Sequence, residues 1–338
     1  MKVLVTGACG YIGAHTVVDL VENDIEPISI DNFSRSSPQM LQNIDRILQK
    51  PLINHIIDLC DSQKMRQFFE KTPNIDGIIH FAAYKSVPES VAKPLSYYHN
   101  NIVALINLLE CTRDYGIPAF VFSSSCSVYG NAPQLPVDEQ TPIEKAQSPY
   151  AYTKQIGEQM VSDFARIHTQ TRCVSLRYFN PAGAHPSTQI GEVQEQAQNL
   201  VPYITQTAIG KRPFLTIFGN DYDTPDGTCI RDYVHVSDIA HAHTLALQYI
   251  AQSKNPINNE IFNLGSGTGS SVLEAITAFE KVSGKKLNYH FGPRREGDVA
   301  AVYANKQKAQ QFLAWNPQFS LEDIMRTAWI WEQKMAMI

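Results

Sequence analysis

The sequence predicts an α/β protein in which a doubly wound parallel sheet is followed by a smaller α/β C-terminal substrate domain. Two observations predict this fold class: short β-branched apolar runs alternate with longer amphipathic stretches, and a glycine-rich turn follows the first of these runs. The 338 residues, 43% hydrophobic and 18% charged, are enough for about two globular domains. A formal net charge of -5 without a long basic block argues against nucleic acid and membrane surfaces as partners.

The first half of the chain is expected to alternate strands and helices. The apolar run at residues 3–5 is the first predicted strand, and the amphipathic stretch 11–23 is the first helix. Apolar runs predict further strands at 27–30, 54–57 and 78–81. Helical periodicity then predicts helices at 94–115 and about 149–168, each followed by a buried strand, at 120–122 and 173–176.

The regular alternation is lost after Asn180, where loops rich in Pro and Gly begin, such as residues 220–227. We therefore place one domain at residues 1–180 and a second, smaller one mainly at 181–338. A helix and a strand within about 235–264 are expected to rejoin the first sheet.

The six cysteines are scattered, and their spacing predicts neither a zinc site nor a disulfide framework. We therefore expect no metal and a reducing, cytoplasmic environment. The chain begins directly with a strand-like run, and no apolar run nears the ~20 residues of a membrane span, so we expect neither a leader nor membrane insertion.

Gly7, Gly10 and Gly13 form a GxxGxxG pattern between the first predicted strand and the first helix. Glycines at this turn let a pyrophosphate approach the free N–H groups of the helix, as in Rossmann-type sheets. Asp31 follows the second strand, where its carboxylate can accept both hydroxyls of an adenosine ribose and would repel a 2′-phosphate. The pattern favours NAD over NADP; the alternative for Asp31 is a helix N-cap.

Tyr150 and Lys154 lie four residues apart just after Ser148-Pro149, a typical helix start, so both project from one helix face. The strand at 120–122 leads into three serines, which places the Ser125 hydroxyl at the carboxyl edge of the sheet. A tyrosine with a pKa of ~10 becomes a base near pH 7 only after stabilisation by about 4 kcal/mol. Lys154 and a positive nicotinamide ring can supply it, with Ser125 bridging substrate and Tyr150.

These three motifs together resemble the extended short-chain dehydrogenases/reductases. Four further segments narrow the resemblance to the UDP-glucose 4-epimerase family: residues 178–186, 221–228, 231–236 and 293–298. The similarity runs from Lys2 to about Trp331.

The resemblance implies a tightly held NAD, a UDP-hexose substrate and inversion at carbon-4 through a 4-keto sugar, with catalysis by Ser125, Tyr150 and Lys154. It also implies a homodimer formed by the helices at 94–115 and 149–168. Residues 1–180 would then be the NAD-binding domain and 181–338 mainly the UDP-sugar-binding domain.

The implied cofactor contacts are Gly7, Gly10, Tyr11, Ile12, Gly13, Asp31, Asn32, Asp58, Leu59, Phe81, Ala82, Lys85, Asn100, Ser123, Tyr150, Lys154 and Phe179. The implied substrate contacts are Ser125, Tyr150, Asn180, Asn199, Leu200, Phe218, Arg231, Arg295, Asp298 and Val302.

Arg231 and Arg295 suit a diphosphate because a guanidinium can meet it with two hydrogen bonds. The alternative is that each pairs with its neighbouring acid, Asp232 or Glu296.

Val302 departs from the family pattern, in which bacterial UDP-glucose-specific members carry tyrosine four residues beyond Asp298. A small residue there leaves room for a 2-N-acetyl group, so we expect activity on UDP-GlcNAc and UDP-GalNAc as well. A shift of one residue would place the ring of Tyr303 at this position instead.

Two other functions remain open from the sequence. A nucleotide-sugar 4,6-dehydratase needs an acid and a base after the serine, where this chain has Cys126 and Ser127. A non-catalytic NAD-binding protein would not need Tyr150 and Lys154, which are both present.

Overall fold

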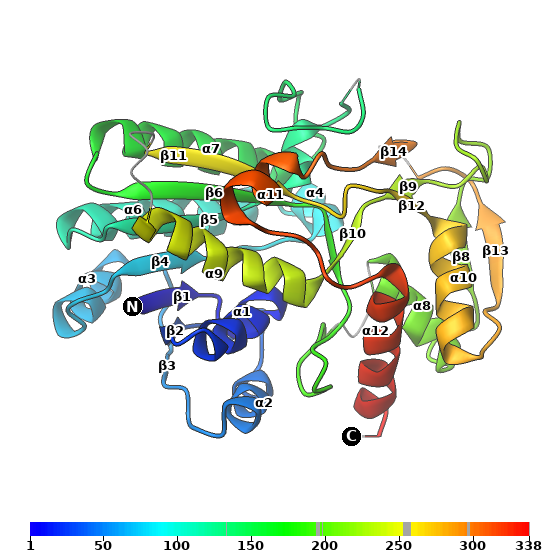
Figure 1. Cartoon of the computed structure of the whole chain (residues 1–338), viewed down its shortest axis with the longest axis horizontal. Helices are drawn as coiled ribbons and strands as arrows, with labels where there is room; N and C mark the ends of the chain where they lie inside the picture. Colours follow the sequence, from blue (N-terminus) through cyan, green and yellow to red (C-terminus); the bar gives the residue numbers. More distant parts are fainter. Residues whose placement is uncertain (133, 194–196, 198, 253–257, 296–297, 338) are drawn as a thin grey trace.

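The structure, a computed structural model, describes all residues except 133, 194–196, 198, 253–257, 296–297 and 338. Its centre is a seven-stranded sheet in the order β11-β6-β5-β4-β1-β2-β3, in which every neighbouring pair is parallel (Figure 1). The chain moves outward from β1 in one direction and then returns to build outward from β4 in the other. This reversal defines a doubly wound sheet, so the predicted Rossmann-type α/β fold is confirmed. The strands are β1 (Lys2–Thr6), β2 (Glu26–Ile30), β3 (Asn54–His55), β4 (Gly77–His80), β5 (Ala119–Ser125), β6 (Arg172–Tyr178) and β11 (Asn259–Leu264).

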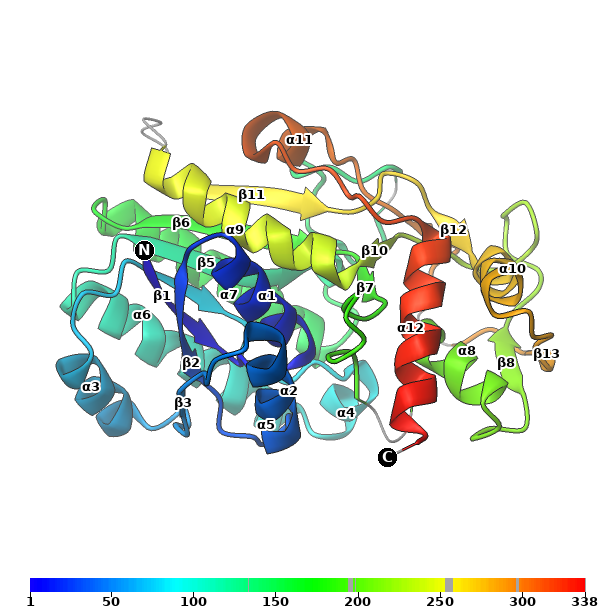
Figure 2. The same ribbon diagram turned by 60° about the horizontal axis from the view of Figure 1, so that its bottom comes forward.

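Helices cover both faces of this sheet because alternate strand residues point to opposite sides. On β1, Val3 and Val5 pack into one core with helices α1 (Tyr11–Glu22) and α9 (Val236–Gln252), whereas Leu4 packs into another. Figure 2 shows α1 and α9 side by side across the first face. The second face carries α3 (Ser62–Lys71), α6 (Ala104–Asp114) and α7 (Pro149–Ile167).

The segment 94–115 differs from the single α-helix that periodicity predicts. It consists of α5 (Pro94–Tyr98), a π-helical turn at His99–Val103, and α6. The wider turn directs Asn101 inward, where its amide accepts a hydrogen bond from the Tyr84 N–H (2.8 Å) and donates to Thr153 (3.1 Å) on α7. A polar side chain that needs several buried partners explains the local π geometry.

A second group of elements has its own apolar core, which contains Phe279, Met325 and Trp329. It comprises α8 (Leu200–Ala208), β8 (Leu215–Phe218), α10 (Val272–Ser283), β13 (Tyr289–Gly292) and α12 (Leu321–Met335). Meanwhile β11 pairs with β6, and α9 packs on the large sheet. The division into domains at residue 180 stays a prediction. The remaining elements are α2 (Pro38–Leu48), α4 (Val87–Ala92), the 3-10 turn Cys126–Tyr129, β7 (Asn180–Ala182), β9 (Ile230–Arg231), β10 (Tyr233–His235), β12 (Ser270–Ser271), β14 (Ala301–Val302) and α11 (Gln307–Leu313).

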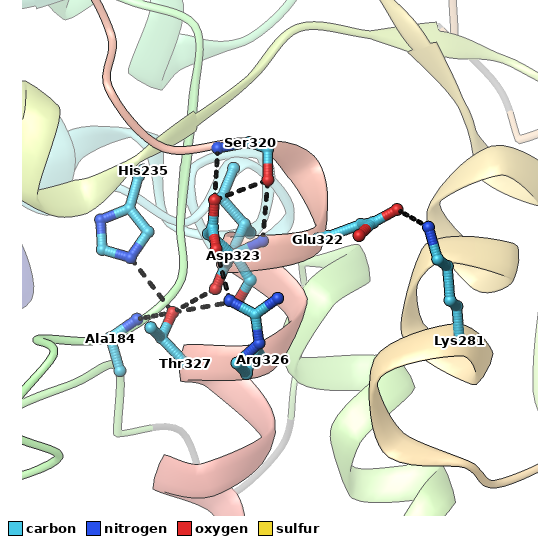
Figure 3. A network of polar contacts seen from close by, with 9 residues as sticks. Ala184, His235, Lys281, Ser320, Glu322, Asp323, Arg326 and Thr327 are labelled. Atoms are coloured by element: carbon cyan, nitrogen blue, oxygen red, sulfur yellow. Dashed lines mark hydrogen bonds and ion pairs between the residues drawn. The ribbon is translucent and has the colours of Figure 1, made fainter.

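Polar contacts in the first turns of α12 connect the second group of elements to β10 and to the segment after β7 (Figure 3). Ser320 and Asp323 form a capping box, which fixes where the helix begins. One turn later, the Thr327 hydroxyl accepts a hydrogen bond from the Ala184 N–H and contacts the His235 ring, both at 3.1 Å. The helix α12 is therefore held against β10 and the segment that follows β7.

Among the helices that the structure describes, none is long and apolar enough to cross a membrane.

Candidate active site

A pocket of about 790 Å³ opens at the carboxyl ends of the large sheet's strands, where the strand order reverses. Its walls come from both groups of elements: the β1–α1 turn lies at one end, and α8 and β8 lie at the other. This is the edge of a doubly wound sheet where ligands usually bind.

The turn between β1 and α1 requires glycine for steric reasons. A Cβ atom on Gly13 would lie 2.2 Å from the Gly7 carbonyl oxygen, and one on Gly7 would lie 2.8 Å from the Ala82 nitrogen. Gly7 also has φ of 68°, and Gly10, the N-cap of α1, offers no side chain to the helix N–H groups. The turn therefore leaves these donors available to an anion in the pocket.

Asp31 stands just beyond β2, with its side chain 7% exposed. Its carboxylate accepts hydrogen bonds from the Cys9 N–H (2.9 Å), the Phe33 N–H (2.9 Å) and the Ser36 hydroxyl (2.7 Å). Ser37, not Asp31, caps α2, so the N-cap interpretation of Asp31 is wrong. These donors fix the carboxylate at the wall of the pocket, where it can still accept hydroxyl donors.

Tyr150 and Lys154 lie on the first turns of α7. Ser148 caps the helix by accepting the Ala151 N–H (3.1 Å), and Pro149 occupies its first turn. Lys154 is 5% exposed and donates from Nζ to the Ser123 carbonyl oxygen at 2.6 Å. Its Nζ lies 5.9 Å from the centre of the Tyr150 ring, and Ser125 lines the same pocket, where its hydroxyl acts to lower the pKa of Tyr150. The structure thus brings the three predicted catalytic residues together at one wall.

Burial dominates the titration of both groups on α7. It raises the pKa of Tyr150 to about 12, against the opposing effect of the Ser125 hydrogen bond. It lowers the pKa of Lys154 to about 8, although the Glu158 carboxylate acts to raise it. In the ligand-free pocket the phenolate is therefore disfavoured, and a positive charge beside Tyr150 is needed before it can act as a base.

Every predicted cofactor and substrate contact lines this one pocket except Val302. Val302 lies beside the site on β14, paired with Arg231, and packs in a small apolar cluster with Cys126 and Phe179. The ring of Tyr303 lies on another side, near Gly269, where a Cβ would come 3.2 Å from it. Val302 therefore packs in the cluster that contains Cys126, the residue after Ser125, whereas the Tyr303 ring packs near Gly269.

Arg231 pairs with Asp298 at 3.1 Å rather than with its neighbour Asp232, so that alternative is wrong. Asp232 instead accepts hydrogen bonds from the Ser266 N–H (2.7 Å) and the Ala304 N–H (3.0 Å). The Arg295 guanidinium lies 4.5 Å from the centre of the Phe218 ring, and its alternative partner Glu296 is outside the described residues.

Two ion pairs at the pocket went unnoticed in the sequence. Arg35 pairs with Glu89 at 2.8 Å, and Lys85 pairs with Glu192 at 2.8 Å. The position of Arg35, four residues after Asp31 in the loop that follows β2, was a usable signal. No local pattern marks Glu192, because it lies 107 residues from its partner. Within the described ranges, no cluster of three or more His, Cys, Asp or Glu side chains could hold a metal ion.

Comparison with known proteins gives three kinds of similarity. The chain matches the family profile described as GDP-mannose 4,6 dehydratase over residues 4–328. It is 45% identical over 334 residues to UDP-glucose 4-epimerase 2 of Arabidopsis thaliana, covering 98% of this chain and 94% of that one.

Two solved structures are also similar. The UDP-glucose 4-epimerase of Stenotrophomonas maltophila, with bound NAD and formylated UDP-arabinopyranose, superposes with a TM-score of 0.96 at 40% identity, covering 100% of this chain and 99% of that one. The UDP-Glc/GlcNAc 4-epimerase of Campylobacter jejuni gives a TM-score of 0.86 at 36% identity, covering 98% and 99%.

Lys154→Met is expected to stabilise the ligand-free protein at pH 7. Folding lowers the lysine's pKa from 10.5 to about 8, so the cost of burying its charge is fully present below pH 8 and fades between pH 8 and 10.5. The substitution also removes the hydrogen bond to Ser123, which reduces the gain. We therefore expect the free energy of unfolding to rise by about 2 kcal/mol at pH 7, and the gain to disappear near pH 10.5. Urea unfolding at several pH values measures it, with exposed Lys50→Met as control. A variant no more stable than wild type at pH 7 would contradict this expectation.

Proposed function

Since the chain belongs to the UDP-glucose 4-epimerase family of extended short-chain dehydrogenases/reductases, we propose that its pocket interconverts UDP-glucose and UDP-galactose with bound NAD. The chain is accordingly an NAD-dependent isomerase that inverts carbon-4 of a UDP-hexose. The observation that carries this proposal is a single pocket lined by Tyr150, Lys154 and Ser125. The glycine-rich β1–α1 turn lines the same pocket, and so do Arg231 and Arg295.

The residues at the first end of the pocket fit NAD. A Cβ at Gly7 or Gly13 would clash with neighbouring backbone, so only glycine allows the tight turn that presents the helix N–H groups to a pyrophosphate, and the fixed Asp31 carboxylate suits two ribose hydroxyls. Asn32, Asp58, Leu59 and Lys85 lie along the same wall, as the family resemblance predicts for cofactor contacts. When bound, NAD supplies a hydride acceptor that is reduced and reoxidised within one turnover.

Tyr150 is the proposed base and acid of the reaction. Its oxygen would take the proton from the sugar's 4-hydroxyl as that alcohol is oxidised to the 4-keto sugar. After the keto sugar has turned about its link to the diphosphate, the phenol would return the proton to the carbon-4 oxygen, while carbon-4 regains its hydrogen on the opposite face. Ser125, which lines the same pocket, would bridge the phenol and the substrate oxygen. Lys154, whose Nζ lies 5.9 Å from the centre of the Tyr150 ring, would orient the cofactor ribose, and its positive charge would favour the phenolate.

The other end of the pocket is proposed to hold the UDP group. Arg231 and Arg295 lie there with Asn180, Asn199 and Phe218. The side-chain amide oxygen of Asn180, Oδ1, is buried and accepts no hydrogen bond from the described residues. This favours a ligand hydroxyl or amide as its donor. A guanidinium can meet a diphosphate with two hydrogen bonds, which suits Arg295, whereas the Arg231 Nη1 already donates to two backbone carbonyl oxygens and Arg231 would contribute mainly its charge.

Dehydration is disfavoured although the matching family profile is described as a 4,6-dehydratase. Such chemistry needs an additional acid and base at the carboxyl end of β5. Here the chain continues into the turn Cys126–Tyr129, and burial raises the pKa of the Cys126 thiol to about 12. A thiol and a hydroxyl in this position offer no acid and base for the reaction.

A second proposal concerns the substrate range: the pocket also accepts UDP-GlcNAc and UDP-GalNAc. Its support is Val302, which packs against the cluster next to Ser125 while the neighbouring Tyr303 ring lies on the other side. The similar Campylobacter jejuni enzyme is a UDP-Glc/GlcNAc 4-epimerase.

We also propose a homodimer in the cytoplasm. The outer faces of α4 to α7 carry exposed apolar side chains, which a twofold partner would cover: Val91, Leu95, Ile106 and Tyr152 are 42% to 79% exposed. All six cysteines are free thiols, as suits a reducing compartment.

Tyr150→Phe is expected to lower kcat for UDP-galactose by about 100- to 10,000-fold, because the base is lost while the ring remains. Purified protein is incubated with the sugar nucleotide without added cofactor, and products are separated chromatographically. Bound NAD, measured after denaturation, should stay unchanged. A wild-type protein that holds NAD yet forms no UDP-glucose would refute the proposed function, and a 4-keto-6-deoxy product would favour the dehydratase.

Val302→Tyr is expected to reduce turnover of UDP-GlcNAc at least about tenfold, because the ring fills the space beside Ser125, and to leave UDP-galactose turnover nearly unchanged. Tyr303→Phe is the matched control, since it alters the neighbouring residue on the other side. Wild-type protein without measurable activity on UDP-GlcNAc would end this second proposal.

Leu95→Asp is expected to convert the dimer into monomers, because it places a charge within the proposed apolar contact. Sedimentation equilibrium measures the mass, and Ile53→Asp, at an equally exposed site outside α4 to α7, is the control. A wild-type protein that sediments at 37.9 kDa would contradict the dimer.

A further inference from the structure

Behind Tyr150 and Lys154 lies a cluster of buried polar side chains to which the mechanism above assigns no role. At its centre Glu158, 6% exposed, pairs with Arg177, 2% exposed. Neither residue lines the pocket. Buried ion pairs are costly to desolvate and often add little stability, so this pair invites a functional explanation.

The carboxylate of Glu158 is fully engaged. Arg177 donates to it twice, from Nε to Oε1 at 2.8 Å and from Nη2 to Oε2 at 2.6 Å. The Ser124 hydroxyl donates a further, short hydrogen bond to Oε1. Two parallel bonds from one guanidinium fix the plane of the carboxylate as well as its position.

Arg177 is in turn fixed from the far side. Its Nη1 donates to the Tyr129 hydroxyl at 2.8 Å, and that hydroxyl donates to the Asn263 amide oxygen at 2.6 Å. These contacts join α7, β5, β6 and β11 behind the pocket. The orientation of Glu158 is therefore set by the sheet and not by its own helix alone.

Two consecutive serines at the end of β5 contact different residues of α7, and a third lines the pocket with Tyr150. The Ser123 carbonyl accepts from Lys154, the Ser124 hydroxyl donates to Glu158, and Ser125 lies at the pocket wall that Tyr150 shares. The three α7 residues follow one another at intervals of four, so they occupy successive turns of one helix face. Any displacement of Glu158 is thus transmitted to the strand end that holds both Lys154 and Tyr150.

The charges near Lys154 come from several elements. On β4, burial and the neighbouring Lys154 lower the pKa of His80 to about 3, so this ring is neutral. On β6, burial raises the pKa of the Tyr178 phenol, so it is also neutral, whereas Arg177 is a cation. On α7, Tyr150 is neutral in the ligand-free pocket, and Glu158 is the carboxylate whose charge favours protonated Lys154.

We propose that Glu158, oriented by Arg177, is a positioning residue for the reaction, which keeps Lys154 charged and aligned with Ser123 beneath Tyr150. This inference rests on the proposed function, because it assigns Lys154 the role it has there. Glu158 contacts neither the substrate nor the cofactor and acts through Lys154 and the end of β5.

The test follows the titration of Lys154 directly, in protein labelled with ¹³C at lysine Cε and assigned with Lys154→Met. In Glu158→Gln, Lys154 should lose its proton at a pH about one to two units lower than in wild type, because a negative charge is removed nearby. In Arg177→Met, which removes a positive charge, the titration should move to higher pH. Opposite shifts distinguish an electrostatic role from general loosening of the fold.

The same samples give a second measurement in the pH dependence of epimerisation. The alkaline limb of kcat should shift in the same direction as the Lys154 titration for each variant, while KM for UDP-galactose changes less than about twofold because Glu158 does not line the pocket. Asp163→Asn, an exposed carboxylate on the same helix, is the matched control and should alter neither measurement. An inactive wild type would refute the proposed function, but the NMR comparison would still decide the role of Glu158.

If Glu158→Gln does not fold, the double variant Glu158→Gln/Arg177→Met removes both charges, a change that buried pairs often tolerate. Its Lys154 should titrate below that of Arg177→Met. A Lys154 titration in Glu158→Gln that matches wild type, or shifts of the same sign in the two single variants, would overturn the proposal.

Discussion

The site depends on a single geometric constraint: parallel strands end at the same edge of a sheet. Because β1, β2, β4, β5 and β6 all run in one direction, the residues that follow them meet in one pocket although they are far apart in the sequence. The reversal of strand order beside β1 opens a crevice there, since the connections on its two sides lead to opposite faces. The glycine-rich β1–α1 turn, Asp31 and the serines of β5 are thereby placed along one wall, where the Asp31 carboxylate also accepts a hydrogen bond from the Cys9 N–H of that turn.

The second constraint is that the chemistry requires a charged lysine in a place where burial disfavours charge. Lys154 is 5% exposed, and its hydrogen bond to the Ser123 carbonyl offsets only part of the desolvation. The same burial raises the pKa of Tyr150, so the ligand-free pocket disfavours both the Tyr150 phenolate and the Lys154 ammonium. In the proposed reaction, an oxidised nicotinamide ring would bring the positive charge that the phenolate needs. Tyr150 would then act as a base only once the cofactor is present.

The sequence predicted those parts of the site whose residues are close neighbours in the chain. The glycine turn, Asp31 after the second strand, and the four-residue interval between Tyr150 and Lys154 are local patterns with local physical reasons. The partners of these residues could not be predicted in the same way. Glu158 and Arg177 come from a helix and a strand, and Lys85 and Glu192 are 107 residues apart, so only the assembled fold pairs them. The π-helical turn at His99–Val103 was not predicted for a related reason. The buried hydrogen bonds of Asn101 are made with Tyr84 and Thr153, which are distant in the sequence.

The ion pairs around the pocket explain how it can accept two anionic ligands. Lys85, Arg35 and Arg231 each hold a carboxylate partner, respectively Glu192, Glu89 and Asp298. Each pair has at least one partly exposed member, so water screens it more than it screens a fully buried pair. A phosphate can then replace or share the carboxylate while the cation stays in place, which avoids the entropy of ordering a free side chain on binding. The buried pair of Glu158 and Arg177 differs in this respect, since no ligand reaches it and its bidentate geometry resists exchange. In the proposed reaction, the ion pairs at the pocket wall would lie where ligands enter, and the buried pair would hold Lys154 in place.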